Sequence, residues 1–149
     1  MTFSRSMQRL LRLRESLERQ EELKMALTSA RLQAAQAAQA AQQAQQRTEQ
    51  ESQLRALKAG TAGAELQASG LRQGVDEQRR ERLNAVTAER QSEQAAQRGV
   101  LLGARRDRET LTTLSTRFQR ARQRERTRRE QAAADEAYLL YGSDTNPED

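Results

Sequence analysis

The stretch Lys58-Ala-Gly-Thr-Ala-Gly-Ala-Glu-Leu66 decides the fold of this 149-residue chain. Gly70 and Gly74 follow it closely, whereas residues 3–59 contain neither glycine nor proline. Because a glycine inside a helix costs about 1 kcal/mol relative to alanine, a cluster of glycines predicts a turn. We expect one helical arm over residues 3–58, a turn over 59–64 and a second arm over 65–141, opening with a short helix at about 64–70.

Composition and apolar spacing identify both arms as coiled-coil helices. Ala, Glu, Lys, Leu and Arg make up more than half of the chain, aromatic residues are only 3% of it, and Pro147 is its single proline. Such a composition is typical of long helices and coiled coils. On the first arm a heptad pattern predicts a packed stripe. Its positions are Leu10, Leu13, Leu17, Gln20, Lys24, Leu27, Arg31, Ala34, Ala38 and Ala41.

The second arm carries a similar stripe, so the two arms are expected to pack on each other. Its positions are Leu83, Val86, Arg90, Glu93, Gln97, Val100, Ala104, Asp107, Leu111, Leu114, Phe118 and Ala121. The sequence therefore predicts an all-α fold, a two-helix antiparallel coiled-coil hairpin with a longer C-terminal helix, over residues 1–141. The Ala- and Gln-rich residues 33–46 bury little surface, so we expect this middle part to be weakly held. Residues 142–149 are expected to form a disordered acidic tail.

Several classes of function are excluded by residues that the chain lacks. It has no Cys and no His, which removes thiol chemistry, zinc fingers and imidazole catalysis. Asp135 and Glu136 form a carboxylate pair, but a thin two-helix protein offers no partly buried pocket of the kind that catalytic carboxylates need. We expect no enzyme activity, no cofactor and no metal. The N-terminus has no apolar run typical of a signal peptide, which favours a cytoplasmic protein.

A basic stretch follows the packed part of the second arm. The chain carries a formal charge of +5, and residues 117–141 hold seven arginines against four acids. These arginines could form a solvated helix face, dock on an acidic protein or bind nucleic acid. The interrupting acids and the absence of interleaved aromatic residues make nucleic acid the weakest of the three.

Two further segments leave alternatives open. Residues 138–141, Tyr-Leu-Leu-Tyr, could anchor a partner or fold back on Phe3 and Met7. The amphipathic N-terminus, residues 3–17, could lie on an anionic membrane, although its leucines serve equally well in a coiled coil.

Three separated motifs resemble one protein family. Phe3-Ser-Arg-Ser-Met-Gln-Arg-Leu-Leu-Arg-Leu-Arg-Glu15 is similar to the opening of flagellar FliJ-type proteins. Lys58–Leu66 resembles their mid-chain turn, and Arg129-Glu-Gln-Ala-Ala-Ala-Asp-Glu-Ala137 resembles their C-terminal signature. The YscO-like stalk proteins of virulence type III secretion systems fit almost as well. Flagellar members often carry aromatic residues in the half near the turn, and this chain has none between Phe3 and Phe118.

The resemblance implies a stalk protein of a type III export apparatus, cytoplasmic and peripheral to the inner membrane. It implies a monomer when free, with a hexameric export ATPase, an export-gate membrane protein and export chaperones as partners. The turn region, with Leu66, Leu71 and Val75, would approach the gate. The ATPase would be bound by Phe3, Met7, Leu10, Phe118, Arg122, Arg124, Arg126, Arg129, Gln131, Asp135 and Glu136. The alternatives are a generic dimeric coiled-coil scaffold and, less favoured, a nucleic-acid binder.

Overall fold

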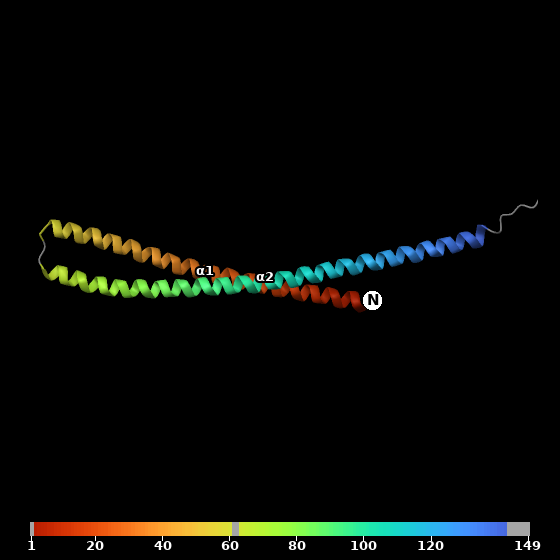
Figure 1. Cartoon of the computed structure of the whole chain (residues 1–149), viewed down its shortest axis with the longest axis horizontal. Coiled ribbons are helices and arrows are strands. Elements are labelled where there is room, and N and C mark those ends of the chain that lie inside the picture. The colour runs from red at the N-terminus through yellow and green to blue at the C-terminus, as the bar shows by residue number, and fades with distance from the viewer. Residues whose placement is uncertain (1, 61–62, 143–149) are drawn as a thin grey trace, which may run out of the picture. The chain divides into compact units, whose positions relative to one another are not determined.

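A computed structural model describes residues 2–60 and 63–142, with side chains from residue 4 onward. The described residues form two helices and no strand: α1, Thr2–Lys58, and α2, Gly63–Gly142 (Figure 1). The expected all-α, two-helix fold with a longer second helix is confirmed. The expected acidic tail, apart from Gly142, lies outside the described residues.

Gly60 ends the first helix for a clear conformational reason. Its φ is +77°, in the left-handed region, where an L side chain is strained and glycine is not. The Ala59 amide donates a hydrogen bond to the Arg55 carbonyl at 3.1 Å, and the Gly60 amide donates one to the Leu57 carbonyl at 3.3 Å. These bonds satisfy carbonyls that the end of α1 would otherwise leave unpaired.

The expected short helix near the turn is not a separate element. Helix α2 runs without a break from Gly63 and includes Gly70 and Gly74. Once a helix has begun, each further residue adds a hydrogen bond, so an isolated glycine weakens it without ending it. Of the four clustered glycines, only Gly60 adopts the backbone conformation that a turn requires.

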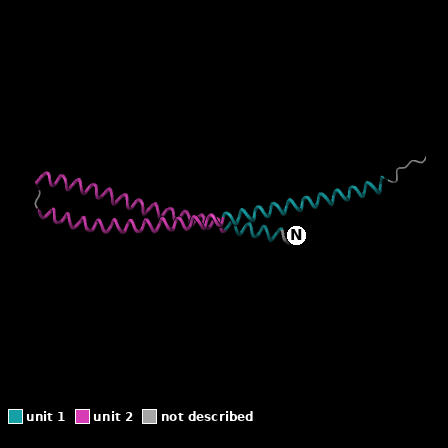
Figure 2. The backbone as a smooth tube through the Cα atoms, viewed as in Figure 1, with its two compact units in different colours: residues 1–16, 105–149 teal, residues 17–104 magenta. Residues whose placement is uncertain are grey.

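The chain divides into two compact units, coloured separately in Figure 2. Unit 2 comprises residues 17–104 and includes the turn, whereas unit 1 comprises residues 1–16 and 105–149. In unit 2 the cross-helix hydrogen bonds join Gln39 to Asn84 at 2.7 Å, and the Ser29 hydroxyl to Gln94 at 3.1 Å. The residue number of the α2 partner increases as that of the α1 partner decreases, which is the order expected of an antiparallel arrangement.

The packed face, here called the seam, recurs in steps of three and four residues on both helices. In unit 2 it includes Glu18, Glu21, Met25, Thr28, Leu32, Ala35, Gln39 and Gln42 of α1, and Leu83, Thr87, Arg90, Gln94, Gln97, Leu101 and Ala104 of α2. In unit 1 it includes Ser4, Met7, Leu11 and Arg14 of α1, and Arg108, Leu111, Ser115 and Phe118 of α2. This is a heptad spacing, as expected, but many of the seam residues are polar.

The expected stripe on α1 was wrong by one position. Leu10, Leu13, Leu17 and Leu27 are exposed, and each lies immediately before a seam residue. On α2 half of the expected stripe lies on the seam, from Leu83 to Phe118 at every seventh residue. Each residue of the other half lies one position before a seam residue or, for the last of them, before the position where the seam would continue. These residues are Val86, Glu93, Val100, Asp107, Leu114 and Ala121. Two neighbouring registers have the same heptad spacing, and they differ by a rotation of about 100°.

Polar bonds across the helices occupy much of the seam. Gln97 Nε2 donates to the Glu21 carboxylate at 2.6 Å, and Lys24 donates to the same carboxylate at 2.8 Å. The hydrogen bond from Lys24, followed by that from Gln97, holds the pKa of Glu21 below its ordinary value. In unit 1, Arg14 Nη1 lies 3.0 Å from Asp107 Oδ2, an exposed ion pair worth little on its own.

The buried apolar side chains of the described residues all lie in unit 2: Leu32, Ala35 and Leu101. We expected residues 33–46 to be weakly held. Buried side chains do occur in that range, at Ala35 and Gln42, whereas the change of register by one position leaves Leu10, Leu13 and Leu114 exposed.

Replacing Gln42 with leucine is expected to stabilise the protein. The Gln42 side chain is only 6% exposed, and among the described residues its Nε2 has no hydrogen-bond partner. An unsatisfied buried amide is unfavourable, so Gln42→Leu should raise the free energy of unfolding by about 1–2 kcal/mol. Thermal denaturation followed by circular dichroism measures this. The neighbouring Gln43→Leu, at an exposed position, is the matched control and should change stability by less than about 0.5 kcal/mol. A destabilised Gln42→Leu variant would contradict the seam described above.

Candidate partner-binding segment

The last part of α2 is exposed on every side. From residue 119 to residue 142 no side chain is buried or half-buried. The seam ends at Phe118, which is half-buried, and α2 continues beyond it as regular helix. Residues 119–142 therefore present both the seam face and the outer face of α2 to solvent, and we call them the exposed segment.

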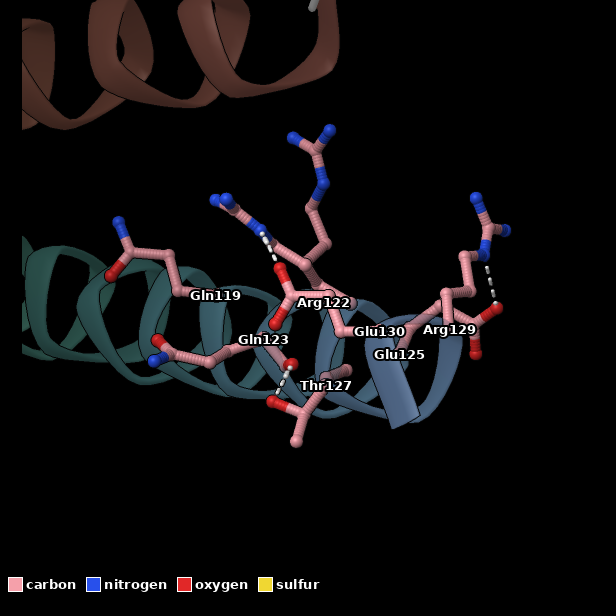
Figure 3. A pocket seen from close by; sticks show the side chains of 9 residues that line it. Gln119, Arg122, Gln123, Glu125, Thr127, Arg129 and Glu130 are labelled. Carbon is pink, nitrogen blue, oxygen red and sulfur yellow. Dashed lines mark hydrogen bonds and ion pairs between the residues drawn. The ribbon is translucent and has the colours of Figure 1, made fainter. Parts of the chain in front are cut away.

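Arginines dominate the first half of the exposed segment. Arg126 Nε donates to Glu130 at 2.8 Å, and Arg129 Nε donates to Glu125 at 3.0 Å. Both bonds join residues four apart on one helix and are strongly exposed, so each contributes little to stability. Figure 3 shows these side chains extending from a single helix around a shallow surface hollow, with the bond between Arg129 and Glu125 dashed. A partner's carboxylates could replace these intrahelical acids.

Phe118 links the seam to the arginines. The Arg122 guanidinium carbon lies 5.7 Å from the centroid of the Phe118 ring, a cation–π contact. This contact joins the last seam residue to the first arginine on the continuation of the seam face. Arg122 and Arg129 lie four and eleven residues after Phe118, so they continue the seam face of α2, and Arg126 lies beside that face.

A second row of arginines lies on another side of α2, mostly at positions immediately before those of the seam face and its continuation. Arg117, Arg120, Arg124 and Arg128 are spaced three and four apart and are all exposed. Of these four, only Arg124 was among the expected site residues. The helical period, applied to residues 117–128, is a signal that could have grouped them.

The end of the exposed segment is apolar. Tyr138, Leu139, Leu140 and Tyr141 are 71–79% exposed, so they do not fold back on Met7. Four large side chains in succession on a helix point in all directions around it. Of the two alternatives that the sequence left open, an anchor for a partner is the one that this exposure allows.

The other expected contact residues are only partly gathered near the exposed segment. Met7 is half-buried on the α1 seam of unit 1 and Leu10 is exposed beside it, while the Phe3 side chain lies outside the described ones. Gln131, Asp135 and Glu136 are exposed within the segment itself.

The residues assigned to the gate contact lie on α2 near the turn, in unit 2. Leu66, Leu71 and Val75 are exposed, and Leu71 and Val75 line a shallow groove with Gln45 and Glu49 of α1. Leu54 and Leu57 on α1 are exposed as well, and they were not among the expected contact residues. The end of unit 2 that holds the turn therefore offers apolar side chains from both helices.

Within residues 2–60 and 63–142 no helix has an apolar stretch long enough to cross a membrane. No protein-family model matches the sequence, and neither a curated protein nor a solved structure is found to match it.

Proposed function

We propose that this protein is a central-stalk-like component of a type III protein export apparatus, flagellar or of a virulence system. In this role the exposed segment docks in the pore of a hexameric export ATPase, and the turn region contacts the export gate. The protein handles export chaperones and works in the cytoplasm at the inner membrane. It has no catalytic role of its own, and it enters the pore as a single chain.

One observation carries the proposal: residues 119–142 form a regular helix with no side chain covered. A helix of this length that packs on nothing gains no tertiary stabilisation and is a candidate for docking. Its six arginines and its terminal Tyr138–Tyr141 provide charge and apolar anchors for a protein surface. The motif resemblance points to the ATPase pore as the surface concerned.

The direct test is stimulation of the export ATPase encoded in the same genome. Adding the full chain to the ATPase is expected to raise the rate of ATP hydrolysis and to promote ring assembly, measured by phosphate release and by sedimentation. An ATPase whose rate and assembly are both unchanged by an excess of the chain would refute the proposal. A gel-shift assay tests binding to nucleic acid instead. At about 0.15 M salt, where the Debye length is about 8 Å, we expect no discrete shift.

The complex with the ATPase is expected to be sensitive to salt. The arginines of the exposed segment are solvated, and salt screens interactions between solvated charges. We expect the dissociation constant to rise about tenfold or more between roughly 0.1 M and 0.5 M salt, as measured by fluorescence anisotropy of labelled chain. Binding that persists unchanged in molar salt would show that the contact is not electrostatic.

A further inference from the structure

The one-position difference between the apolar stripe and the seam leaves one side of unit 2 unusually apolar. We call the residues immediately before seam positions the leading flank, and those immediately after them the trailing flank. The leading flank of unit 2 carries Leu17 and Leu27 on α1 and Val86 and Val100 on α2, all exposed. Over the same length the trailing flank is polar or alanine except for Leu102.

The leading flanks of the two helices lie on the same side of the pair. In an antiparallel helix pair, positions just before the seam on one helix lie next to those just before the seam on the other. The trailing-flank residues Ser29 and Asn84 hydrogen-bond across to the seam residues Gln94 and Gln39, which agrees with this geometry. An apolar stripe that includes one flank as well as the seam is typical of helices that pack on more than one neighbour.

The charges on this side are divided between the two helices. On α1 the leading flank from Leu17 to Ala41 carries Lys24 and Arg31 and no acid. On α2 the leading flank from Arg82 to Gly103 carries Glu89 and Glu93, and its one base, Arg82, lies at its end. Within one chain Lys24 pairs with Glu21 at 2.8 Å and Glu93 with Arg90 at 2.8 Å, while Arg31 and Glu89 have no such ion pair among the described residues. The flank residues themselves leave a mostly basic half on α1 and a mostly acidic half on α2, and such a face is complementary to itself, which is the condition for a symmetric interface between identical chains.

We propose that the leading flank of unit 2 binds the same face of a second copy of this chain, forming an antiparallel four-helix arrangement. The two-fold axis runs parallel to the helices, so α1 of each copy lies on α2 of the other. Arg31 then faces Glu93 of the second copy, and Leu27 faces its Ala96. The small residues Ala34, Ala96 and Gly103 allow the helices to approach closely.

The area is adequate for a stable pair. Residues 17–41 of α1 span about 37 Å at about 1.5 Å per residue, and two adjacent helices are about 20 Å wide. The face therefore covers roughly 700 Å² per chain, close to the approximately 800 Å² per partner of a standard interface. The exposed segment and the residues near the turn are outside this face, so pairing does not cover the proposed ATPase contact. Pairing departs from the single free chain that the family resemblance implies, and entry into the pore as a single chain requires the pair to separate.

The first test is the mass of the full chain in solution. Sedimentation equilibrium is expected to show a concentration-dependent mixture of the 16.9 kDa chain and its dimer. Leu27→Glu places a charge in the centre of the face and should leave only the single chain. Leu102→Glu is the matched control, because Leu102 is a similarly exposed leucine on the trailing flank, and it should pair like the unaltered chain.

The second test uses the division of charge and distinguishes pairing from a change in the fold of one chain. Lys24→Glu/Arg31→Glu makes both halves of the face acidic, and Glu89→Lys/Glu93→Lys makes both halves basic. Each variant alone should pair about tenfold more weakly or worse, because like charges face each other twice in each dimer. An equimolar mixture should form heterodimers, since both contacts of a mixed pair are again complementary.

Circular dichroism of each variant verifies that the chain remains helical. Recovery on mixing cannot come from contacts within one chain, because these are unchanged by the second variant. A chain that stays single at all concentrations, or a mixture that does not recover pairing, would overturn the proposal and leave this face to a different protein. Neither result bears on stimulation of the ATPase.

Discussion

Truncation of the chain after Ala121 is expected to abolish stimulation of the export ATPase. The shortened protein keeps all of α1 and the part of α2 that carries the seam, so its helices should remain nearly intact. It loses Arg122, Arg126 and Arg129 together with the four anchors at residues 138–141. Loss of several such contacts should weaken binding by about a hundredfold or more, which is below detection at ordinary protein concentrations.

A full-length variant separates the role of charge from that of length. Arg122→Glu/Arg126→Glu/Arg129→Glu retains the full length of the chain and reverses the charge of three arginines on and beside the face that continues the seam, and it should also reduce stimulation to the basal rate. The matched control reverses three exposed arginines of unit 2, Arg47, Arg72 and Arg79, and should stimulate normally. Equal loss in both triple variants would show that only total charge matters, and full stimulation by the truncated chain would refute the docking of the exposed segment.

Replacement of Leu32 with alanine is expected to be among the most destabilising single changes. Leu32 is 8% exposed and is one of the buried apolar residues of the seam. Removing a buried leucine side chain loses its transfer free energy and leaves a cavity. We expect the free energy of unfolding to fall by about 2 kcal/mol, with a decrease of several degrees in the melting temperature. Thermal and urea denaturation followed by circular dichroism measure both values.

Leu27→Ala is the control that decides the register. The heptad spacing alone places Leu27 on the packed stripe, whereas the structure leaves it 53% exposed. At concentrations low enough to keep the chain single, Leu27→Ala should cost less than about 0.5 kcal/mol. The opposite ranking, with Leu27 important and Leu32 dispensable, would show that the helices pack in the register expected from the sequence.

Part of the candidate binding segment could be predicted from the amino-acid sequence, and part could not. The basic stretch and the apolar residues 138–141 are visible in the sequence, and their exposure follows from the length of α2 beyond its seam. The contact between Arg122 and the Phe118 ring was not predicted, nor was the assignment of Arg126 to Glu130 and Arg129 to Glu125. Each arginine has several acids or rings within helical reach, and only coordinates choose among them.

The local sequence by itself determined the helices and their end at Gly60. Alanine, leucine, arginine and glutamate favour helix at every position, and glycine alone adopts the left-handed conformation without strain, so these features need no tertiary contact. Only the tertiary structure decided which face of each helix is covered. Adjacent heptad registers repeat with the same period, and the choice between them depends on contacts between residues far apart in the chain, such as Gln97 with Glu21. That choice turned Leu17, Leu27, Val86 and Val100 outward, because rotating a helix by one residue exchanges its covered face for the neighbouring one.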